Sequence, residues 1–350
     1  MVLAGAGRLW FWAAMAPSRK PALAFAMAPG LEAGVFEPVE LERLAAVAEI
    51  LDSRPLADFS EARASGLLAR AEILVTGWMC PYLDAAVLAR APHLGLIAHA
   101  AGTIRFTVAP EAFARGIRVV SAAAANAVPV AEFALAAILL VNKRAFRLRE
   151  IYRRDARSAV GEMPWIGNRR RRVGLVGASR VGRCLIELLR PFEIEVWVTD
   201  PYLDPAEATA LGVRLASLSE LLAACDVVSL HAPLLDSTRG MIGPRELAQM
   251  RTGATLINTA RGALVDEAAL VREVTSGRID AVLDTVEPEP PPRESALYAT
   301  EGIFLTPHIA GAMGEEVARL GALVVDEIER FVAGTELHHE VHAEDLGRLA

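Results

Sequence analysis

Residues 173–182 read VGLVGASRVG. The apolar run 173–176 is typical of a buried parallel strand, and residues 184–189 are typical of the helix that follows one. A turn beginning at Gly177 lets backbone amides and the positive helix end meet a pyrophosphate, while Gly182 permits close packing of helix on strand. Ser179 replaces the second glycine of the GxGxxG pattern, so the turn alone indicates dinucleotide binding only weakly.

The end of the next strand strengthens this indication. Residues 194–198 form a second apolar run, and Asp200 follows it. A carboxylate at this position can accept hydrogen bonds from ribose hydroxyls and repel a 2′-phosphate, so we expect NAD as the cofactor rather than NADP. Two plainer readings stay open: Asp200 before Pro201 could simply begin a turn, and Arg180 could be solvated instead of contacting the pyrophosphate.

The rest of the second half is regular. Each apolar run is separated from the next by enough residues for a helix, and Ser217, Gly243–Pro244 and Asp266 are typical helix starts. Such alternation predicts a doubly wound parallel sheet, the Rossmann arrangement. The six expected strands are residues 173–176, 194–198, 227–230, 255–258, 279–283 and 303–305.

The first half resembles the second in style and forms another α/β unit. Its expected strands are residues 22–26, 73–76, 96–99 and 117–121. An apolar helix is expected from Pro129 to Arg147, then a polar linker or oligomer arm over 149–172. After Gly314 we expect one more helix through Phe331, followed by a solvated tail that contains His338, His339 and His342.

Length and composition limit the class of protein. The chain has 350 residues, beyond the roughly 250–300 at which a single core stops growing, so two domains are expected. Hydrophobic residues make up 53%, and 43 acidic residues outnumber 36 basic ones, which argues against a nucleic-acid partner. The three cysteines show no metal-ligand spacing, so we expect reduced thiols in a cytoplasmic protein without a metal.

Neither a membrane span nor a secretion signal is expected. The longest stretches free of charged residues, 91–104 and 119–131, are shorter than the roughly 18–20 residues that cross a bilayer. The first fifteen residues have the outline of a signal peptide without a convincing charged start, and a frayed or mis-assigned start before Met15 explains them better.

Three polar residues follow expected strands at the edge where open α/β sheets bind ligands: Arg261, Glu289 and His308. Taken singly, each could be a solvated or structural residue. Together they fit one chemistry: a guanidinium holds a carboxylate and polarises the adjacent carbonyl, while an imidazole paired with a carboxylate moves a proton. Pairing with Glu289 would favour the imidazolium form of His308.

With these residues, the sequence resembles the D-isomer-specific 2-hydroxyacid dehydrogenases, a family that includes phosphoglycerate, glyoxylate/hydroxypyruvate and D-lactate dehydrogenases. The resemblance runs from about Pro21 to Val341. Its most specific stretches are residues 173–177 with Gly182, 230–234 (LHAPL), 256–267 (LINTARGALVDE), 281–290 (AVLDTVEPEP) and 305–311 (LTPHIAG).

The resemblance implies a role for each matching residue. Arg261 would bind the substrate carboxylate, Glu289 would tune the histidine, and His308 would be the general acid/base. Asp284 would hydrogen-bond the nicotinamide carboxamide. The implied cofactor contacts are Gly177, Ser179, Arg180, Val181, Gly182, Asp200, His231, Pro233, Thr238, Thr259, Ala260, Asp284 and His308, and the implied substrate contacts are Thr76, Gly77, Trp78, Gly102, Thr103, Asn126 and Arg261.

It also implies a discontinuous, flavodoxin-like substrate domain, residues 1–124 and 317–350, and an NAD-binding Rossmann domain, residues 125–316. The expected reaction interconverts a small 2-oxo acid and its D-2-hydroxy acid, in a homodimer packed through residues 133–165. Two alternative functions stay open. One is a non-catalytic NAD sensor or corepressor, and the other is a formate or phosphite oxidoreductase. The formate enzymes have Gln at the position of Glu289, so Glu289 argues against that branch. Ser179, Pro129 and Leu235 depart from the family pattern.

Overall fold

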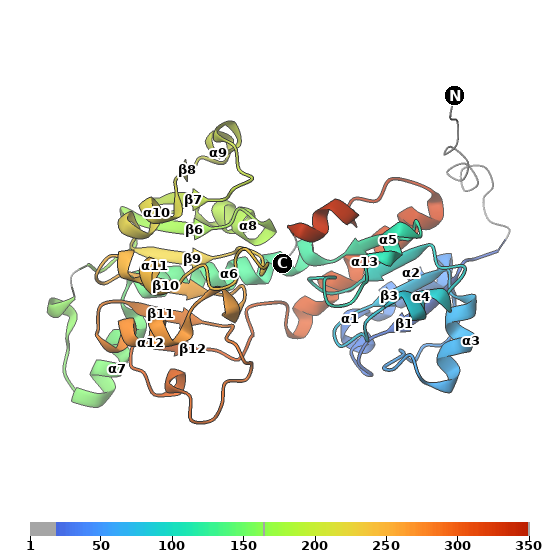
Figure 1. Cartoon of the computed structure of the whole chain (residues 1–350), viewed down its shortest axis with the longest axis horizontal. Helices are drawn as coiled ribbons and strands as arrows, with labels where there is room; N and C mark the ends of the chain where they lie inside the picture. Colours follow the sequence, from blue (N-terminus) through green and yellow to red (C-terminus); the bar gives the residue numbers. More distant parts are fainter. Residues whose placement is uncertain (1–18, 164, 349–350) are drawn as a thin grey trace. The chain divides into compact units, whose positions relative to one another are not determined.

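The computed structural model describes residues 19–163 and 165–348, so the expectations for the first fifteen residues lie outside the described part. By its internal contacts the chain divides into two compact units. The first includes the described residues up to Asn126 and those from Met313 onward, and the second is Ala127–Ala312. Each unit is built on its own sheet (Figure 1).

The first unit contains a six-stranded sheet in the order β13-β5-β4-β3-β1-β2. All pairings are parallel except that of β13 with β5. The five parallel strands therefore have the flavodoxin order 2-1-3-4-5. β2 lies on one side of β1, and β3, β4 and β5 follow on the other side, so the order of the strands reverses between β1 and β3. The strands are β1 (Ala22–Ala26), β2 (Glu49–Ile50), β3 (Ile73–Thr76), β4 (Leu96–His99), β5 (Arg118–Ser121) and β13 (Glu340–Val341).

The helices of this unit are α1 (Glu32–Val35), α2 (Pro38–Val47), α3 (Ala62–Arg70), α4 (Ala85–Ala89), α5 (Glu111–Ala114) and α13 (Ala318–Ala333), with short 3-10 turns η4 (Gly314–Val317) and η5 (Ala343–Gly347). The expectation of a merely solvated tail after α13 is wrong. Leu337 and Val341 are buried, and the backbone amides of His338 and His339 donate to the buried carboxylate of Glu327 at 2.9 and 3.2 Å.

The second unit contains a seven-stranded parallel sheet in the order β12-β11-β10-β9-β6-β7-β8. Counted from β6, this is the Rossmann order 3-2-1-4-5-6 with one strand added beyond the sixth. The sequence predicted six strands; the seventh is the two-residue edge strand β8, too short to form an apolar run. The strands are β6 (Arg171–Val176), β7 (Ile194–Thr199), β8 (Arg214–Leu215), β9 (Val227–Leu230), β10 (Thr255–Asn258), β11 (Asp280–Leu283) and β12 (Ile303–Leu305).

Local capping explains where the crossover helices begin. Ser217 caps α10 with Glu220 in a capping box, and Asp266 caps α12 by accepting from the Ala269 amide at 2.8 Å, which confirms both predicted starts. Pro244 is the first residue of α11. These helices are α8 (Arg180–Leu189), α9 (Pro205–Leu211), α10 (Leu218–Ala224), α11 (Pro244–Gln249) and α12 (Glu267–Thr275), with 3-10 turns η1 (Val160–Glu162), η2 (Gly262–Leu264) and η3 (Ala296–Tyr298).

The region after β5 differs from the prediction. One helix, α6 (Ala123–Asn142), begins before Pro129 because alanines 123–125 favour the helix, and a second helix, α7 (Ala145–Asp155), covers part of the expected linker. Arg144, which has a positive φ of 54°, separates the two helices.

Among the described residues, α6 is long and apolar enough to cross a membrane, with a mean hydropathy of 2.0. Glu132 divides its sequence into two charge-free stretches that are each too short to span a bilayer, so no span was expected. Ala134, Ile138 and Val141 of this helix pack against Leu175 and other core residues of the second sheet. This burial accounts for its apolar composition within the fold.

Candidate active site

Three loops of the second unit begin at the carboxyl ends of neighbouring strands. β10, β11 and β12 are adjacent and parallel, so their carboxyl ends lie together, and the loops that follow contain Arg261, Glu289 and His308. The sequence placed these three residues at this edge, and the structure brings His308 and Glu289 into direct contact.

His308 and Glu289 form a hydrogen-bonded pair. Nδ1 of His308 lies 2.8 Å from Oε1 and 3.0 Å from Oε2 of Glu289. The two side chains keep 47% and 38% of their surface exposed, so a ligand can reach the pair. Because Nδ1 faces the carboxylate, Nε2 is the ring nitrogen that can exchange a proton with a substrate.

Asp284 holds the loop that presents His308. This carboxylate is only 1% exposed and accepts hydrogen bonds from Thr306 Oγ1 at 2.6 Å and from the amides of Ile309 and Ala310 at 2.8 Å each. The amide of His308 donates to the Asp284 carbonyl at 3.0 Å, and His308 has a φ of +55°, which few residues other than glycine adopt. Such backbone strain persists only where surrounding contacts enforce it, as Asp284 does here.

Asn258 braces the loop that presents Arg261. Its side chain donates to the Arg261 carbonyl at 2.8 Å and accepts from the Ala260 amide at 3.1 Å. A Cβ at Gly262 would lie 2.1 Å from the Val286 carbonyl carbon, so only glycine lets this loop pack on the chain leading to Glu289. Burial lowers the pKa of the Arg261 guanidinium while the Glu289 carboxylate opposes that shift; the group stays charged at neutral pH.

The glycine turn after β6 has the shape expected for a phosphate cradle. Gly177 has a φ of +107°, and a Cβ there would lie 2.8 Å from His231 and Ala232 backbone atoms. A Cβ at Gly182 would lie 2.3 Å from the Gly177 carbonyl oxygen. Ser179, by contrast, has a φ of −65° and caps α8, accepting from the Gly182 amide at 3.4 Å. Serine therefore suits this position, and the turn keeps its geometry.

Asp200 ties this turn to the end of β7. One carboxylate oxygen accepts from the Ala178 amide and the other from the Tyr202 amide, both at 2.7 Å. The side chain remains partly exposed, so its free lone pairs can still accept from a ligand. Together with the free amides at the start of α8, these residues fit a dinucleotide.

Several expected cofactor contacts have side chains that the fold already uses. His231 is buried, its Nε2 lies 2.9 Å from Ser229 Oγ, and burial lowers the pKa of this histidine to about 4. Thr238 Oγ1 donates to the Pro233 carbonyl at 2.6 Å. Thr259 is buried, and its hydroxyl has no protein partner among the described residues. Arg180 is exposed and Val181 partly so, both in the first turn of α8, and Ala260 is partly exposed.

The expected substrate contacts of the first unit fall on two loops. Thr76 is fully buried, and its hydroxyl lies 2.9 Å from Nδ1 of His99, so its side chain contacts the neighbouring strand β4 instead of facing solvent. Gly77 and the partly exposed Trp78 follow it. Gly102 and Thr103 follow β4, and a Cβ at Gly102 would lie 3.2 Å from Nδ2 of Asn126, which places Asn126 beside that loop.

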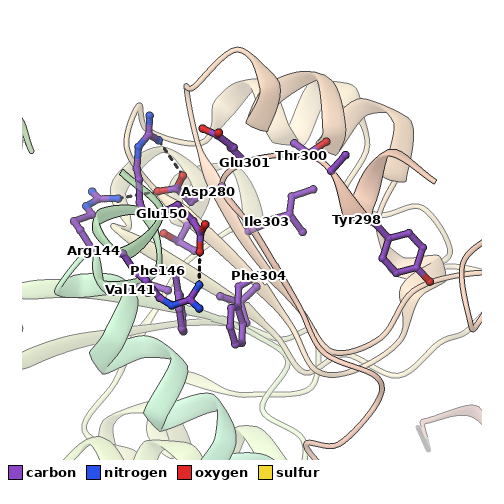
Figure 2. Close-up of a pocket in the computed structure, with 17 residues that line it drawn as sticks. Val141, Arg144, Phe146, Glu150, Asp280, Tyr298, Thr300, Glu301, Ile303 and Phe304 are labelled. Carbon is purple, nitrogen blue, oxygen red and sulfur yellow. Dashed lines mark hydrogen bonds and ion pairs between the residues drawn. The ribbon is translucent and has the colours of Figure 1, made fainter. Parts of the chain in front are cut away.

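A cavity of about 640 Å³ lies at the amino ends of strands in the second sheet (Figure 2). Thr255, Asp280 and Ile303, the first residues of β10, β11 and β12, line it, so it lies at the strand ends opposite those that lead to His308. Phe146 stacks on Phe304 there with ring centroids 4.0 Å apart. Over the described residues, no group of three or more His, Cys, Asp and Glu side chains is placed to hold a metal ion.

Sequence reasoning assigned no role to three residues that shape the site. Asn258 braces the Arg261 loop, Gly262 allows its close packing, and Thr306 bonds to Asp284. All three lie within the stretches that carry the family resemblance. Their contacts form only when neighbouring loops meet, so spacing along the chain could not reveal them.

Comparison with known proteins agrees with this arrangement. A model described as "D-isomer specific 2-hydroxyacid dehydrogenase, NAD binding domain" matches residues 135–310. A D-3-phosphoglycerate dehydrogenase of Mycobacterium bovis is 35% identical over 255 residues, 72% of this chain and 48% of that protein, so the chain spans about half the length of this relative. An (S)-sulfolactate dehydrogenase of Chromohalobacter salexigens is 36% identical over 221 residues, 61% of this chain and 70% of that protein.

A solved structure shares the whole architecture. The crystal structure of a phosphoglycerate oxidoreductase from Rhizobium etli superposes with a TM-score of 0.76 at 25% identity, covering 92% of this chain and 97% of that one. The two α/β units and the matched NAD-binding domain lead to one conclusion: the chain belongs to the D-isomer specific 2-hydroxyacid dehydrogenase family.

Proposed function

We propose that this oxidoreductase interconverts a small 2-oxo acid and its D-2-hydroxy acid, with NAD(H) as the second substrate. The observation that carries the proposal is the His308–Glu289 pair, at 2.8 Å, on the same sheet edge as Arg261. Bound NADH supplies the hydride that the substrate carbonyl carbon gains, and NAD⁺ takes it back in the reverse direction.

Arg261 binds the substrate carboxylate. A guanidinium can make two parallel hydrogen bonds to a carboxylate, and its positive charge also draws electron density from the adjacent carbonyl oxygen. Partial burial strengthens both effects because less water screens the charge. This interaction orients the 2-oxo acid with its reacting carbon at the strand ends.

His308 moves the proton. During reduction its Nε2–H donates to the carbonyl oxygen as the carbon gains hydride, and during oxidation the neutral ring removes the proton from the alcohol. Glu289 accepts from Nδ1–H throughout, so it fixes the orientation of the ring and keeps Nε2 directed toward the substrate. The reaction thus balances: the 2-oxo acid takes up one hydride and one proton.

The glycine turn and Asp200 hold the cofactor. Gly177 and the first turn of α8, with Ser179, Arg180, Val181 and Gly182, would hold the pyrophosphate, and Asp200 would accept from the adenosine ribose. The Asp200 carboxylate would repel a 2′-phosphate, which favours NAD over NADP. The backbones around His231, Pro233, Thr238, Thr259 and Ala260, with Asp284, complete the proposed contacts.

The first unit contributes the remaining substrate contacts. The backbone amides at Gly102 and Thr103 would donate to an anionic substrate, and Asn126 lies beside Gly102. The amide of Gly77 already donates to the Ala26 carbonyl at 3.3 Å, so Gly77 would contribute a close approach of the chain rather than a donor. Trp78, which is partly exposed, would contact the substrate side chain, while the hydroxyl of Thr76 is buried against His99 and Thr76 would support this loop from the end of β3.

A substrate panel tests the proposal. NADH oxidation is measured with glyoxylate, pyruvate, hydroxypyruvate and longer 2-oxo acids, for the unaltered protein and for His308→Ala, Arg261→Ala and, as a matched control on an exposed histidine of the first unit, His93→Ala. We expect turnover that only the first two substitutions abolish. Tight NADH binding without turnover of any 2-oxo acid would instead indicate the non-catalytic sensor.

We also propose that the protein is a cytoplasmic homodimer. The cavity beside α7 is lined in part by residues 141–150, which lie within the range that the resemblance assigns to the dimer, and Phe304 of the adjacent edge strand β12 is 37% exposed beside it (Figure 2). The free cysteines Cys80, Cys184 and Cys225 suit a reducing compartment. Sedimentation equilibrium should give twice the mass of one chain for the unaltered protein and the mass of a single chain for Phe304→Glu. A monomeric unaltered protein would contradict the dimer.

A further inference from the structure

Three loops of the second unit that lead to the proposed site are held to one another. They follow the strands β9, β10 and β11, which lie side by side in the sheet (Figure 1). The first loop, residues 231–243, carries expected cofactor contacts. The second, residues 259–266, contains Arg261, and the third, residues 284–295, contains Glu289. The links between these loops decide how Arg261 and Glu289 lie relative to each other.

The first and second loops are joined through their backbones. The amide of Gly240 donates to the Ala263 carbonyl at 2.8 Å. The amide of Ile242 donates to the Leu264 carbonyl at 3.0 Å. Arg239 directly precedes this paired segment, so its backbone has a fixed position beside the 3-10 turn η2.

An ion pair joins the first loop to the third. Nη1 of Arg239 donates to Oε1 of Glu287 at 3.0 Å. The two side chains keep 57% and 51% of their surface exposed, so neither contributes to the buried core. Within residues 19–163 and 165–348, each of the two forms an ion pair with the other alone. The pair therefore links two loops of the site without adding to the packing beneath them.

The third loop is stiff between Glu287 and Glu289. Pro288 and Pro290 lie on either side of Glu289, and the ring of each proline fixes its own φ angle. Because few backbone torsions remain free here, the position of Glu287 is transmitted to Glu289. Glu289 in turn contacts Nδ1 of His308 at 2.8 Å. A contact made at Glu287 therefore acts on the acid-base pair without touching it.

We propose that Arg239 is a positioning residue for proton transfer. Its ion pair with Glu287 holds Glu289, and through it His308, in register with the loop of Arg261. Proton transfer requires the two heavy atoms to lie within about 2.6–3.2 Å, so a small displacement of the ring slows the reaction. The inference rests on the proposed function, since it concerns the same proton and the same substrate.

The test is a double-substitution cycle on the ion pair. Single-turnover oxidation of NADH is followed at increasing concentrations of the best 2-oxo acid of the substrate panel, for the unaltered protein, Arg239→Gln, Glu287→Gln and the double variant. The limiting rate reports the chemical step, and the concentration dependence reports the apparent affinity for the 2-oxo acid.

We expect the limiting rate to fall by about two- to fivefold in each single variant, the effect that an exposed ion pair supports. The double variant should lose no more than either single variant, because both substitutions break the same link. The apparent affinity for the 2-oxo acid should change by less than about twofold, since Asn258 still braces the Arg261 loop. Arg239→Lys, which keeps a positive charge for Glu287, should recover part of the lost rate.

Two controls separate positioning from a change in folding. Arg245→Gln removes an exposed arginine from the nearby helix α11 and should leave the rate unaltered. The urea midpoint should stay nearly the same in all variants, because the ion pair is exposed.

Each contrary result has a distinct meaning. Unchanged rates in both single variants, or losses that multiply in the double variant, would overturn the link between the loops. A double variant as fast as the unaltered protein would overturn it too, since Arg239 would then only neutralise the charge of Glu287. Absence of turnover by the unaltered protein with every 2-oxo acid would instead overturn the proposed function.

Discussion

Nδ1 of His308 lies 2.8 Å from Oε1 of Glu289, although 19 residues separate them in the chain. The contact leaves Nε2 as the ring nitrogen that faces away from the carboxylate, and the Glu289 carboxylate also acts on the nearby charge of Arg261. Substitution of either residue tests directly whether the pair transfers a proton.

Replacing Glu289 should weaken proton transfer without preventing it. In Glu289→Gln the amide can still bond to Nδ1 but no longer places a negative charge beside the ring, so we expect kcat for reduction to fall by about 10- to 100-fold, against about 100- to 10,000-fold for His308→Ala. Steady-state kinetics across pH 5–9 measure this, with NADH affinity from fluorescence titration as the control. Equal kcat in the unaltered protein and Glu289→Gln would show that the pair has no catalytic role.

Thr306 should act on catalysis through Asp284 and the His308 loop. Removing its hydroxyl in Thr306→Val deletes the 2.6 Å bond to Asp284 and loosens a loop that holds His308 at positive φ. We expect kcat to fall about tenfold with little change in KM, and Thr306→Ser to restore it, because a hydrogen bond to a charged group contributes about 1.5–3 kcal/mol. If Ser and Val variants behave alike, the hydroxyl does not position the loop.

Asp200 should set the choice between NADH and NADPH. Asp200→Ser removes the negative charge that would repel a 2′-phosphate, so the ratio of kcat/KM for NADH to that for NADPH should fall by at least about tenfold. Asp200→Asn removes the charge but keeps one acceptor for the Ala178 or Tyr202 amide. This variant therefore distinguishes the effect of the charge from the effect of losing the hydrogen bonds that hold the turn after β6. An unchanged ratio in both variants would contradict the assignment.

Two buried histidines should make stability depend on pH. Burial lowers the pKa of His99 and His231 from 6.5 to about 4, so the unfolded chain binds protons that the folded chain does not between these values. The stabilisation is complete above pH 6.5 and is lost as pH falls toward 4; at pH 5 the two together cost on the order of 4 kcal/mol.

Urea unfolding at pH 7.5 and pH 5.0 measures this loss. His99→Gln, whose amide can still bond to Thr76, should show a smaller shift of the unfolding midpoint between the two pH values than the unaltered protein. A midpoint that does not change from pH 7.5 to 5.0 would contradict the burial of both neutral rings.

Much of the fold was predictable because its strands are apolar runs. Residues 73–76, 96–99, 227–230 and 255–258 were expected as strands and match β3, β4, β9 and β10. The two-residue strands β2, β8 and β13 were not expected, since each pairs at an edge with too few residues to show a pattern. Helix α7 was missed because its residues are mostly polar, and none of them is buried.

The site was predictable where a residue type and a strand end coincide, as for Arg261 and His308. It was not predictable where a role depends on contacts formed by folding. Burial of Thr76 against His99 and the three donors around Asp284 depend on distant segments meeting, and capping of α8 by Ser179 depends on the local backbone conformation of the turn. The sequence assigned Asp284 to the cofactor, while the structure adds that its carboxylate holds the His308 loop.

The most direct test of the central claim is the reduction of a 2-oxo acid by NADH, with the product resolved on a chiral column, for the unaltered protein and for His308→Ala. We predict stoichiometric formation of the D-2-hydroxy acid, with a rate that falls by at least about 100-fold in the variant while NADH binding persists. Formation of the L enantiomer, or equal rates in the two proteins, would contradict this account.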